Sequence, residues 1–404
     1  MLTQVYSPEP NFITADVAEA VARDSDVIVV TAHPNYPLGR FYPGTRFMRV
    51  EKSTVNGVVV WRVPFFPDHS LSTLRRAISY LSFAAVASVV APLVAGRPDT
   101  VWVYHGPFTT GLSSLFFKIV YRSRLVFTCA DLWPASFVAA GVVKSRFVLS
   151  LAGAYNRALN RAADLIICAT RGAQRQLAEA GIAPQRLTVI PVWIGGSREL
   201  VSRAADIPVD ANSIVYAGNL GPAQKVETII LAAAALRSER PSIRFDIYGS
   251  GASEAHLREL ANRVEATNVT FHGRVPVEQA LKASAAGLAQ IICLQPSPFF
   301  RNTIPSKLFS AFAAGSPILY GLQGEAEMLA ARSGGGIGFD ASEPQTLVTA
   351  VKQLLSLTTS QRESMRSSLR SYFSTHFDPA LLISRYSEIL KSAQPGLTAQ
   401  RFPD

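Results

Sequence analysis

The chain has 404 residues, enough for two or three domains. Hydrophobic types make up 48% and charged types 17%, which excludes a disordered protein. Three cysteines exclude a disulfide framework, so we expect Cys129, Cys168 and Cys293 to be buried, reduced thiols. Six scattered histidines and no closely spaced cysteine pair show no zinc-ligand pattern, and we expect no metal site.

The net charge of +10 is concentrated in the first half of the chain. Residues 1–190 carry 19 Lys and Arg against 11 Asp and Glu, and the remainder carries 20 against 18. No basic helix, zinc finger or aromatic RNA-binding strand is recognisable, so we expect no nucleic-acid partner. An anionic membrane surface or a phosphate-bearing substrate fits the charge better.

The first half alternates between apolar strand-like runs and helix-like runs. The expected strands are 27–31, 58–63, 100–104, 125–129 and 165–168. The expected helices include 15–23, 74–95, 112–121, 149–162 and 172–180. This alternation predicts a parallel sheet covered on both faces.

One expected helix contains the longest apolar run, residues 77–95. The run is nearly long enough to cross a bilayer, but three serines and Pro92 interrupt it. Three interpretations stay open: a helix buried in the domain, a helix that dips into one membrane face, and a transmembrane helix.

The second half repeats the alternation. Its expected strands are 213–217, 244–248, 269–272, 290–294 and 317–319, and its last expected helices are 343–355, 360–373 and 380–391. The predicted fold class is α/β, with two doubly wound Rossmann-like parallel-sheet domains facing a cleft. We expect an N-terminal acceptor-binding domain at 1–192, a C-terminal donor-binding domain at 197–375, and a crossover helix and tail at 376–404. Ligands should bind in the cleft, at the carboxyl ends of the strands.

Residues 216–225 span the end of one strand of the second domain, a glycine-containing turn and the start of a helix. Gly218 and Gly221 allow the backbone to approach a ligand closely. Lys225 is expected in the first turn of that helix, where a positive charge is unfavourable unless an anion binds. The alternative is a solvated lysine beside Glu227.

A second helix start, within residues 302–317, repeats this conflict. Pro305 suits the first helical position, which places Lys307 in the first turn. Two lysines that break the same local rule predict one shared anion. The alternative is two unrelated surface lysines.

Weaker signals come from other strand ends. Gly249 and Gly251 lie between a strand and a helix, although they could form only a tight turn. In the first domain, His105 and Asp131 follow strands and could face a substrate; the alternatives are a hydrogen-bonded loop histidine and a helix cap. Residues 24–26 read Asp-Ser-Asp but precede a strand, so we interpret them as a solvated turn rather than a metal site.

Six segments occur in the order seen in a known family: HPNYPLGRFYPG, DLWPAS, YAGNLGPAQ, IYGSG, TFHGRVP and TIPSKLFSAFAAGSPIL. Together they span nearly the whole chain. The chain resembles retaining glycosyltransferases of the GT-B fold (glycosyltransferase group 1, family 4). It is most similar to the bacterial branch that includes the L-fucosamine transferase of O-antigen and colanic-acid assembly.

The resemblance implies transfer of a sugar, with retention, from a nucleoside-diphosphate donor, with UDP favoured over GDP, and without a metal or other cofactor. Basic residues and helix dipoles would assist departure of the diphosphate. The implied catalytic residues are Asp131, His105, Lys225 and Lys307. The implied donor-binding residues are Gly218, Asn219, Gly221, Gly249, Gly251, Arg274, Asn302, Ser306 and Ser310.

Two positions depart from the family. The broader family carries two glutamates eight positions apart, where this chain has Asn302 and Ser310. A serine at position 310 loses a charge-assisted hydrogen bond to the ribose, worth about 1.5–3 kcal/mol. A non-catalytic or impaired nucleotide-sugar-binding relative is therefore one alternative. A nucleotide-sugar 2-epimerase or a sugar phosphorylase on the same scaffold is another.

The acceptor is inferred from surface chemistry. Arg75 and Arg76 precede the apolar helix, and residues 115–124 mix cationic and apolar side chains, as in peripheral membrane proteins. The sequence thus predicts an undecaprenyl-diphosphate-linked saccharide as acceptor. Because Met1 leads directly into strand-like residues, we expect no signal peptide and a cytoplasmic protein peripheral to the inner face of the plasma membrane.

Overall fold

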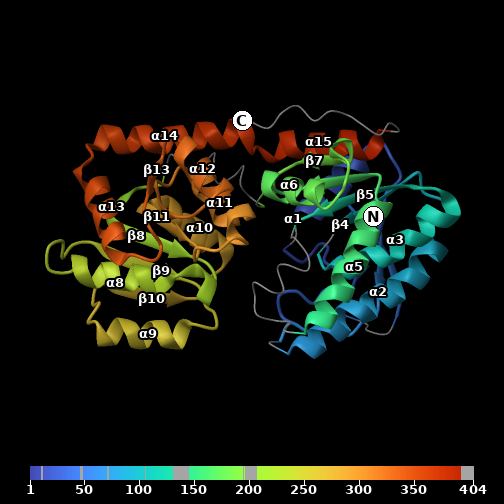
Figure 1. Ribbon diagram of the computed structural model, residues 1–404, viewed down its shortest axis with the longest axis horizontal. Coiled ribbons are helices and arrows are strands. Elements are labelled where there is room, and N and C mark those ends of the chain that lie inside the picture. The colour runs from blue at the N-terminus through green and yellow to red at the C-terminus, as the bar shows by residue number, and fades with distance from the viewer. Residues whose placement is uncertain are drawn as a thin grey trace. The chain divides into compact units, whose positions relative to one another are not determined.

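The computed structural model describes residues 1–10, 12–45, 49–70, 72–104, 106–130, 145–193, 195 and 207–392. The chain divides into two compact units, each visible as an α/β layer structure in Figure 1. The first unit comprises residues 1–192 and 380–404, and the second comprises residues 193–379.

The first unit is built on two groups of strands. One pairs in the order β1 (Ile28–Ala32), β3 (Val58–Val63), β2 (Glu51–Val55), and the other in the order β4 (Thr100–Tyr104), β5 (Arg124–Cys129), β6 (Leu165–Cys168), β7 (Leu187–Val189). Leu2 joins the two groups, because it forms parallel bridges to Val30 of β1 and Val103 of β4. Cys129 and Cys168 are free, buried and paired in register on β5 and β6.

The helices of the first unit include α1 (Phe12–Val21), α2 (Thr73–Ala95), α3 (Leu112–Phe116), α5 (Arg146–Ala162) and α6 (Arg171–Glu179). The predicted helix 112–121 is only partly right. A turn of π-helix (Phe117–Tyr121) follows α3, and Arg122 ends it in the left-handed conformation at φ 56°.

Three strands escaped prediction: β2, β7 and the strand β13 (Gly336–Gly338) of the second unit. β2 pairs antiparallel with β3, so the sheet is mixed rather than wholly parallel. Asn56 and Gly57 connect the two strands, and both have positive φ, at 49° and 83°. An Asn-Gly pair in this conformation forms the tight turn that hairpins prefer.

The second unit holds one parallel sheet in the order β10 (Val269–Gly273), β9 (Arg244–Tyr248), β8 (Asp210–Ala217), β11 (Gly287–Cys293), β12 (Ile318–Gly321), β13 (Gly336–Gly338). Its helices are α8 (Val226–Leu236), α9 (Glu254–Arg263), α10 (Val277–Ala286), α11 (Ser306–Ala314), α12 (Glu325–Arg332), α13 (Pro344–Ser356) and α14 (Thr359–His376). The strand order reverses direction between β8 and β11, and ligands of doubly wound sheets bind at such a switch point.

The last helix, α15 (Pro379–Lys391), packs on the first unit. Tyr386 is buried, with its ring 5.7 Å from that of Trp102 on β4. Arg124 of β5 donates to the carbonyl oxygens of Ile389 and Ser392, at 2.6 and 2.8 Å. The helix is thereby tied to the centre of the first sheet.

Candidate functional site

The carboxyl ends of β8, β9 and β10 are joined by backbone hydrogen bonds that continue beyond the strands. The Gly218 amide donates to Tyr248 O at 2.8 Å, and the Gly249 amide donates to Gly273 O at 2.7 Å. The Leu220 amide donates to a carbonyl of the next loop, Ser250 O, at 2.9 Å. The three loops therefore form one layer, which brings together the predicted glycines at positions 218, 249 and 251.

Close backbone contact makes these glycines necessary. Gly218 and Gly249 have φ values of 145° and 141°, which residues with a side chain rarely adopt. A Cβ atom at Gly249 would overlap the carbonyl oxygen of Gly218, and one at Gly251 would lie 2.5 Å from Leu220 O. A Cβ at Gly218 would meet the Lys307 side chain.

Lys307 lies in the first turn of α11, as predicted, and its ammonium reaches the layer of glycine loops. Nζ donates to the hydroxyl of Tyr216 at 2.7 Å and lies 3.9 Å from the centre of the tyrosine ring. None of the salt bridges found among the described residues includes Lys307. Burial lowers the pKa of this ammonium to about 8. A partly buried cation without a carboxylate partner is suited to an anionic ligand.

Tyr216 was missed by the sequence analysis, although it is the link between Lys307 and the glycine layer. The side chain is buried on β8, and its hydroxyl donates to Asn219 O at 2.6 Å while accepting from Lys307. Burial raises the pKa of the Tyr216 hydroxyl well above its usual value, so the hydroxyl stays protonated and can donate. In sequence, the residue looks like any apolar strand position.

We expect Tyr216→Phe to weaken UDP binding about tenfold. The Lys307 ammonium loses its charge-assisted hydrogen bond to the Tyr216 hydroxyl, and such bonds are worth about 1.5–3 kcal/mol. Without this acceptor, the pKa of Lys307 should also fall below about 8. Calorimetric titration with UDP across the pH range measures both effects. Tyr248→Phe, at the end of the neighbouring strand, is the matched control. If Tyr216→Phe lowers only the thermal midpoint, Tyr216 is merely structural.

The start of α8 differs from the prediction. A 3-10 turn (Pro222–Gln224) precedes the helix, and Lys225 is its N-cap in the left-handed conformation at φ 49°, not a first-turn residue. Two residues favour the 3-10 turn. Pro222 begins it, and the side chain of Gln224 accepts a hydrogen bond from the Gly221 amide at 3.2 Å. Asn219 Nδ2 also donates to Gln224, at 3.3 Å.

The backbone nevertheless brings the starts of α8 and α11 to neighbouring strands. The loop after β11 is bound to the loop after β8, because the Gln295 amide donates to Ala223 O at 2.8 Å and the Cys293 thiol donates to Gln224 O at 3.0 Å. Burial raises the pKa of this thiol to about 12, so it remains protonated. Convergence of Lys225 and Lys307 on one diphosphate stays a prediction.

The other predicted donor residues lie on α11, in the turn before it, and directly after β10. Pro305 is the N-cap of α11 rather than its first residue, so Ser306 takes the first helical position. Ser310 is buried, and its hydroxyl donates to Lys307 O at 3.0 Å within the helix. Asn302 ends the 3-10 turn before the helix, and Arg274 is exposed directly after β10.

In the first unit, His105 and Asp131 lie outside the described residues, directly or almost directly after β4 and β5. The described part of that sheet edge is organised by Glu9, which sequence analysis did not single out. Its carboxylate accepts from the amides of Asn35 and Tyr36 at 2.8 and 2.7 Å and from the Tyr6 amide at 3.2 Å. Burial raises the pKa of Glu9 despite these bonds.

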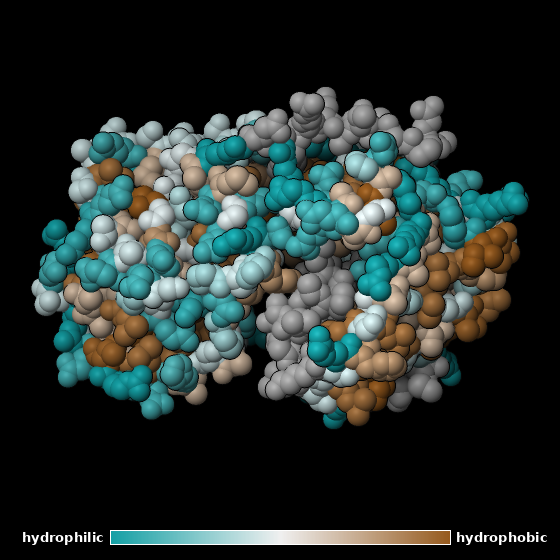
Figure 2. All heavy atoms as spheres, viewed as in Figure 1, coloured by the Kyte–Doolittle hydropathy of each residue, from teal (hydrophilic) through white to brown (hydrophobic). Residues whose placement is uncertain are grey.

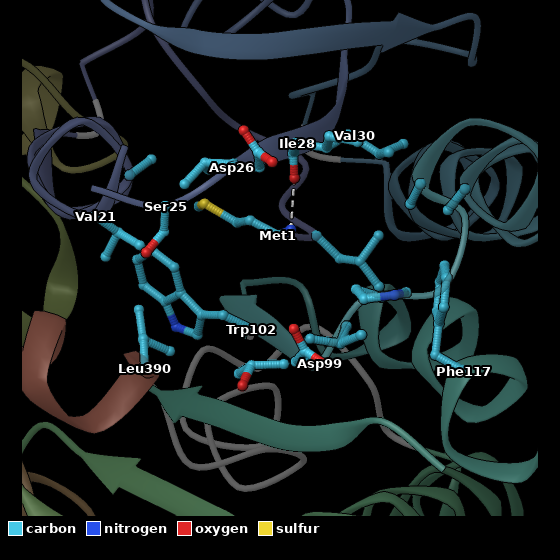
Figure 3. Close-up of a pocket in the computed structure, with 18 of the residues that line it drawn as sticks. Met1, Val21, Ser25, Asp26, Ile28, Val30, Asp99, Trp102, Phe117 and Leu390 are labelled. Carbon is cyan, nitrogen blue, oxygen red and sulfur yellow. Dashed lines mark hydrogen bonds between the residues drawn. The ribbon is translucent and has the colours of Figure 1, made fainter. Parts of the chain in front are cut away.

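A cavity of about 540 Å³ lies at the opposite edge of the first sheet, where β1 and β4 begin. Figure 3 shows Met1, Ile28, Asp99 and Trp102 around it, and the Met1 amino group donates to Ile28 O at 2.6 Å. Burial lowers the pKa of that amino group to about 5. Because ligands of such sheets bind beyond the carboxyl ends of the strands, this cavity is not our candidate site.

Two glycosyltransferase family models match most of the chain. Residues 11–193 match the family model described as glycosyl transferase 4-like domain, and residues 211–357 match the model of glycosyl transferases group 1. The chain is 28% identical over 333 residues to WcaI of Escherichia coli K12, whose name assigns it to colanic acid biosynthesis as a glycosyl transferase; 77% of this chain and 79% of that protein are covered. WbjE of Pseudomonas aeruginosa, also named as a glycosyltransferase, is 23% identical over 300 residues, covering 70% and 73%.

Solved structures match over almost the whole chain. HepE of Anabaena, crystallised with UDP and glucose, has a TM-score of 0.67 at 16% identity, covering 97% of this chain and 98% of that one. WaaG, a glycosyltransferase of lipopolysaccharide biosynthesis, has a TM-score of 0.64 at 18% identity, covering 96% and 98%. At such identities the likeness concerns the fold, and it confirms the predicted GT-B fold class.

Proposed function

The chain belongs to the glycosyltransferase group 1 family, and on that premise we propose that it transfers a sugar from a nucleoside-diphosphate donor, with UDP as the nucleotide. The proposed reaction retains the anomeric configuration and uses no metal. The proposed sugar is an N-acetylamino or deoxy sugar, added to a saccharide of a cell-surface polysaccharide. Two relatives support this proposal: WcaI by its assignment to colanic acid biosynthesis, and HepE by its complexes with UDP.

Lys307 is the observation that carries the proposal. Its ammonium lies at the switch point between β8 and β11, beside a layer of glycine loops whose backbone a ligand can approach closely. When the bond between the sugar and the diphosphate breaks, negative charge develops on the leaving phosphate. A desolvated cation and the N-terminus of α11 stabilise that charge without reorganising. Lys225 is the second proposed cation.

Nucleotide release from a panel of UDP- and GDP-sugars tests the proposal. We expect slow release of UDP from one or more UDP-sugars, and stabilisation of about 2.7 kcal/mol when UDP is present at 100 times its dissociation constant. Binding without release would instead favour the non-catalytic relative, which the serine at position 310 motivates. If no nucleotide sugar of the panel stabilises the protein, the donor site is wrongly assigned.

UDP binding should weaken as the pH rises through about 8. The pKa of Lys307 in the folded protein lies below the ordinary value of 10.5. The destabilisation caused by burying its charge is therefore fully present below pH 8 and is lost as the pH rises from about 8 to 10.5. The apoprotein therefore gains stability across that window. UDP needs the charged form, so its dissociation constant should rise by up to tenfold per pH unit above about 8. Isothermal titration calorimetry at pH 7 to 10 measures this rise of the dissociation constant. A dissociation constant that does not change with pH would contradict the prediction.

The proposed acceptor is a saccharide on undecaprenyl diphosphate, and the proposed location is the cytoplasmic face of the plasma membrane, with the protein bound peripherally. The basic surplus of the first half supports this location, since anionic lipid headgroups attract cationic surfaces. Among the described residues, α2 alone is long and apolar enough to cross a bilayer.

A further inference from the structure

Exposed apolar side chains gather on three segments of the first unit: α2, α3 with the π turn that follows it, and the start of α5. More than half of the large apolar side chains that the described residues expose lie there. They are Leu74, Ile78, Leu81, Val89, Leu93, Leu112, Phe116, Ile119, Val120, Phe147, Val148 and Leu151. We call these twelve residues the apolar face.

The segments of the apolar face are neighbours. The Ser88 hydroxyl on α2 lies 3.2 Å from that of Ser113 on α3. Tyr155 on α5 donates to Thr109 O, in the turn that leads into α3, at 3.3 Å. Figure 1 shows the three helices side by side, and Figure 2 shows brown atoms along the edge that α2 and α3 form.

Helix α2 carries its large apolar side chains on its outer side, unlike a surface helix of a water-soluble protein. Its inward side holds mainly small residues, among them Ala84, Ala87 and Ala91. Its outward side holds Leu81 and Leu93, of which Leu93 is 78% exposed. A water-exposed helix normally carries charged and polar side chains on its outer side, but no charged residue occurs between residues 77 and 95. This pattern suits an apolar environment outside the domain.

The packing of α2 argues against a transmembrane helix. Phe83, Ala87 and Ala91 belong to the same core cluster as Val30 and Val103 on the central strands. A bilayer-spanning α2 would carry these strands and their loops into the hydrocarbon, where irregular backbone groups find no hydrogen-bond partners. The helix must therefore stay on its sheet, with only its outer side reaching lipid.

The charges around the apolar face select an anionic surface. From residue 68 to residue 164 the sequence has ten Lys and Arg against four acidic residues, of which Asp68 pairs with Arg75 and Asp164 pairs with Lys118. Arg97 follows α2, Arg146 begins α5 and Arg157 lies within α5, and all three side chains are exposed. A protein interface has no need of such one-sided charge, whereas a membrane rich in anionic lipid attracts it.

We propose that the apolar face is the membrane-binding surface of this protein. The outer sides of α2, α3 and α5 enter the headgroup and upper acyl region of an anionic bilayer, with α2 parallel to the membrane plane. The arginines around them contact lipid phosphates. This inference rests on the proposed function only for the location of the protein at the plasma membrane. It depends on neither the sugar donor nor the acceptor.

Co-sedimentation with vesicles tests the inference without any nucleotide sugar. The full-length protein should bind vesicles of phosphatidylglycerol and phosphatidylcholine more tightly than vesicles of phosphatidylcholine alone, and less tightly as salt is added. The double variant Leu81→Glu with Leu93→Glu should lose at least tenfold in affinity. Replacing Arg97 and Arg157 by Gln should cost about fivefold for each residue. Met328→Glu, on α12 of the second unit and 46% exposed in the native protein, is the matched control and should bind like the native protein.

Three results would overturn the inference. One is no binding of the native protein to anionic vesicles at low salt, and another is native-like binding by the Leu81→Glu, Leu93→Glu variant. The third is a dimer of the native protein that this variant dissociates, which would make the apolar face an interface between two copies. UDP release by the same variants, measured without vesicles, reports separately on the proposed function and should be unchanged.

Discussion

Lys307→Met should lower the rate of UDP release about 100- to 1,000-fold, the usual cost of removing one group that stabilises developing charge in an active site. The same substitution should stabilise the apoprotein by about 1–3 kcal/mol, because an ammonium whose pKa is depressed to about 8 is costly to keep charged at neutral pH. A loss of activity together with a gain of stability is typical of a residue kept for function rather than for folding.

Lys282→Met is the matched control for this experiment. Lys282 is an exposed lysine on α10 of the same unit, and its removal should change neither activity nor stability appreciably. Steady-state UDP release and thermal unfolding measure the two effects. Release by Lys307→Met within tenfold of the native rate, or a lowered unfolding free energy, would contradict the role assigned to Lys307.

Gly249→Ala should destabilise the second unit by about 3 kcal/mol and abolish detectable UDP binding. The added methyl group would overlap Gly218 O, so the loops after β8 and β9 must separate, and the φ of 141° adds strain. That separation also displaces the backbone amides that we expect to face the diphosphate. Urea denaturation and calorimetry with UDP measure the two losses.

Gly273→Ala separates the two causes. Gly273 also has a positive φ, 71°, but a Cβ atom there would meet nothing within 4 Å. Its substitution should lower the free energy of unfolding only by the usual strain of a left-handed backbone conformation, about 1–2 kcal/mol. If the two alanine variants lose the same stability, close contact between the loops is not what requires Gly249.

The alternation of strands and helices could be predicted because each buried parallel strand is a near-continuous apolar run. The reversal at Asn56 and Gly57 could also have been found, since an Asn-Gly pair between alternating residues is a hairpin signal. The position of Lys225 was harder to predict. A short 3-10 turn before α8 differs from a helix start by only a residue or two of hydrogen bonding.

The residues of the candidate site that could be predicted are those whose type alone is unusual at their place in the sequence. Glycines at strand ends and lysines at helix starts break local rules, and the structure gathers Gly218, Gly249, Gly251 and Lys307 after β8, β9 and β11. The convergence of Lys225 on the same point stays a prediction. Tyr216 and Glu9 break no local rule. Their importance lies in partners that are distant in sequence, 91 residues away for Tyr216 and 26 for Glu9, so only the fold reveals it.

The pKa of the Lys307 ammonium with and without UDP is the most direct measure of the central claim. NMR of lysine labelled with ¹³C at Cε gives that pKa by pH titration, with Lys307→Met assigning the signal. We predict a value near 8 for the free protein and a rise to at least the ordinary 10.5 when UDP is bound, because the diphosphate supplies the missing negative charge. A pKa that UDP leaves unchanged would show that Lys307 does not bind the diphosphate.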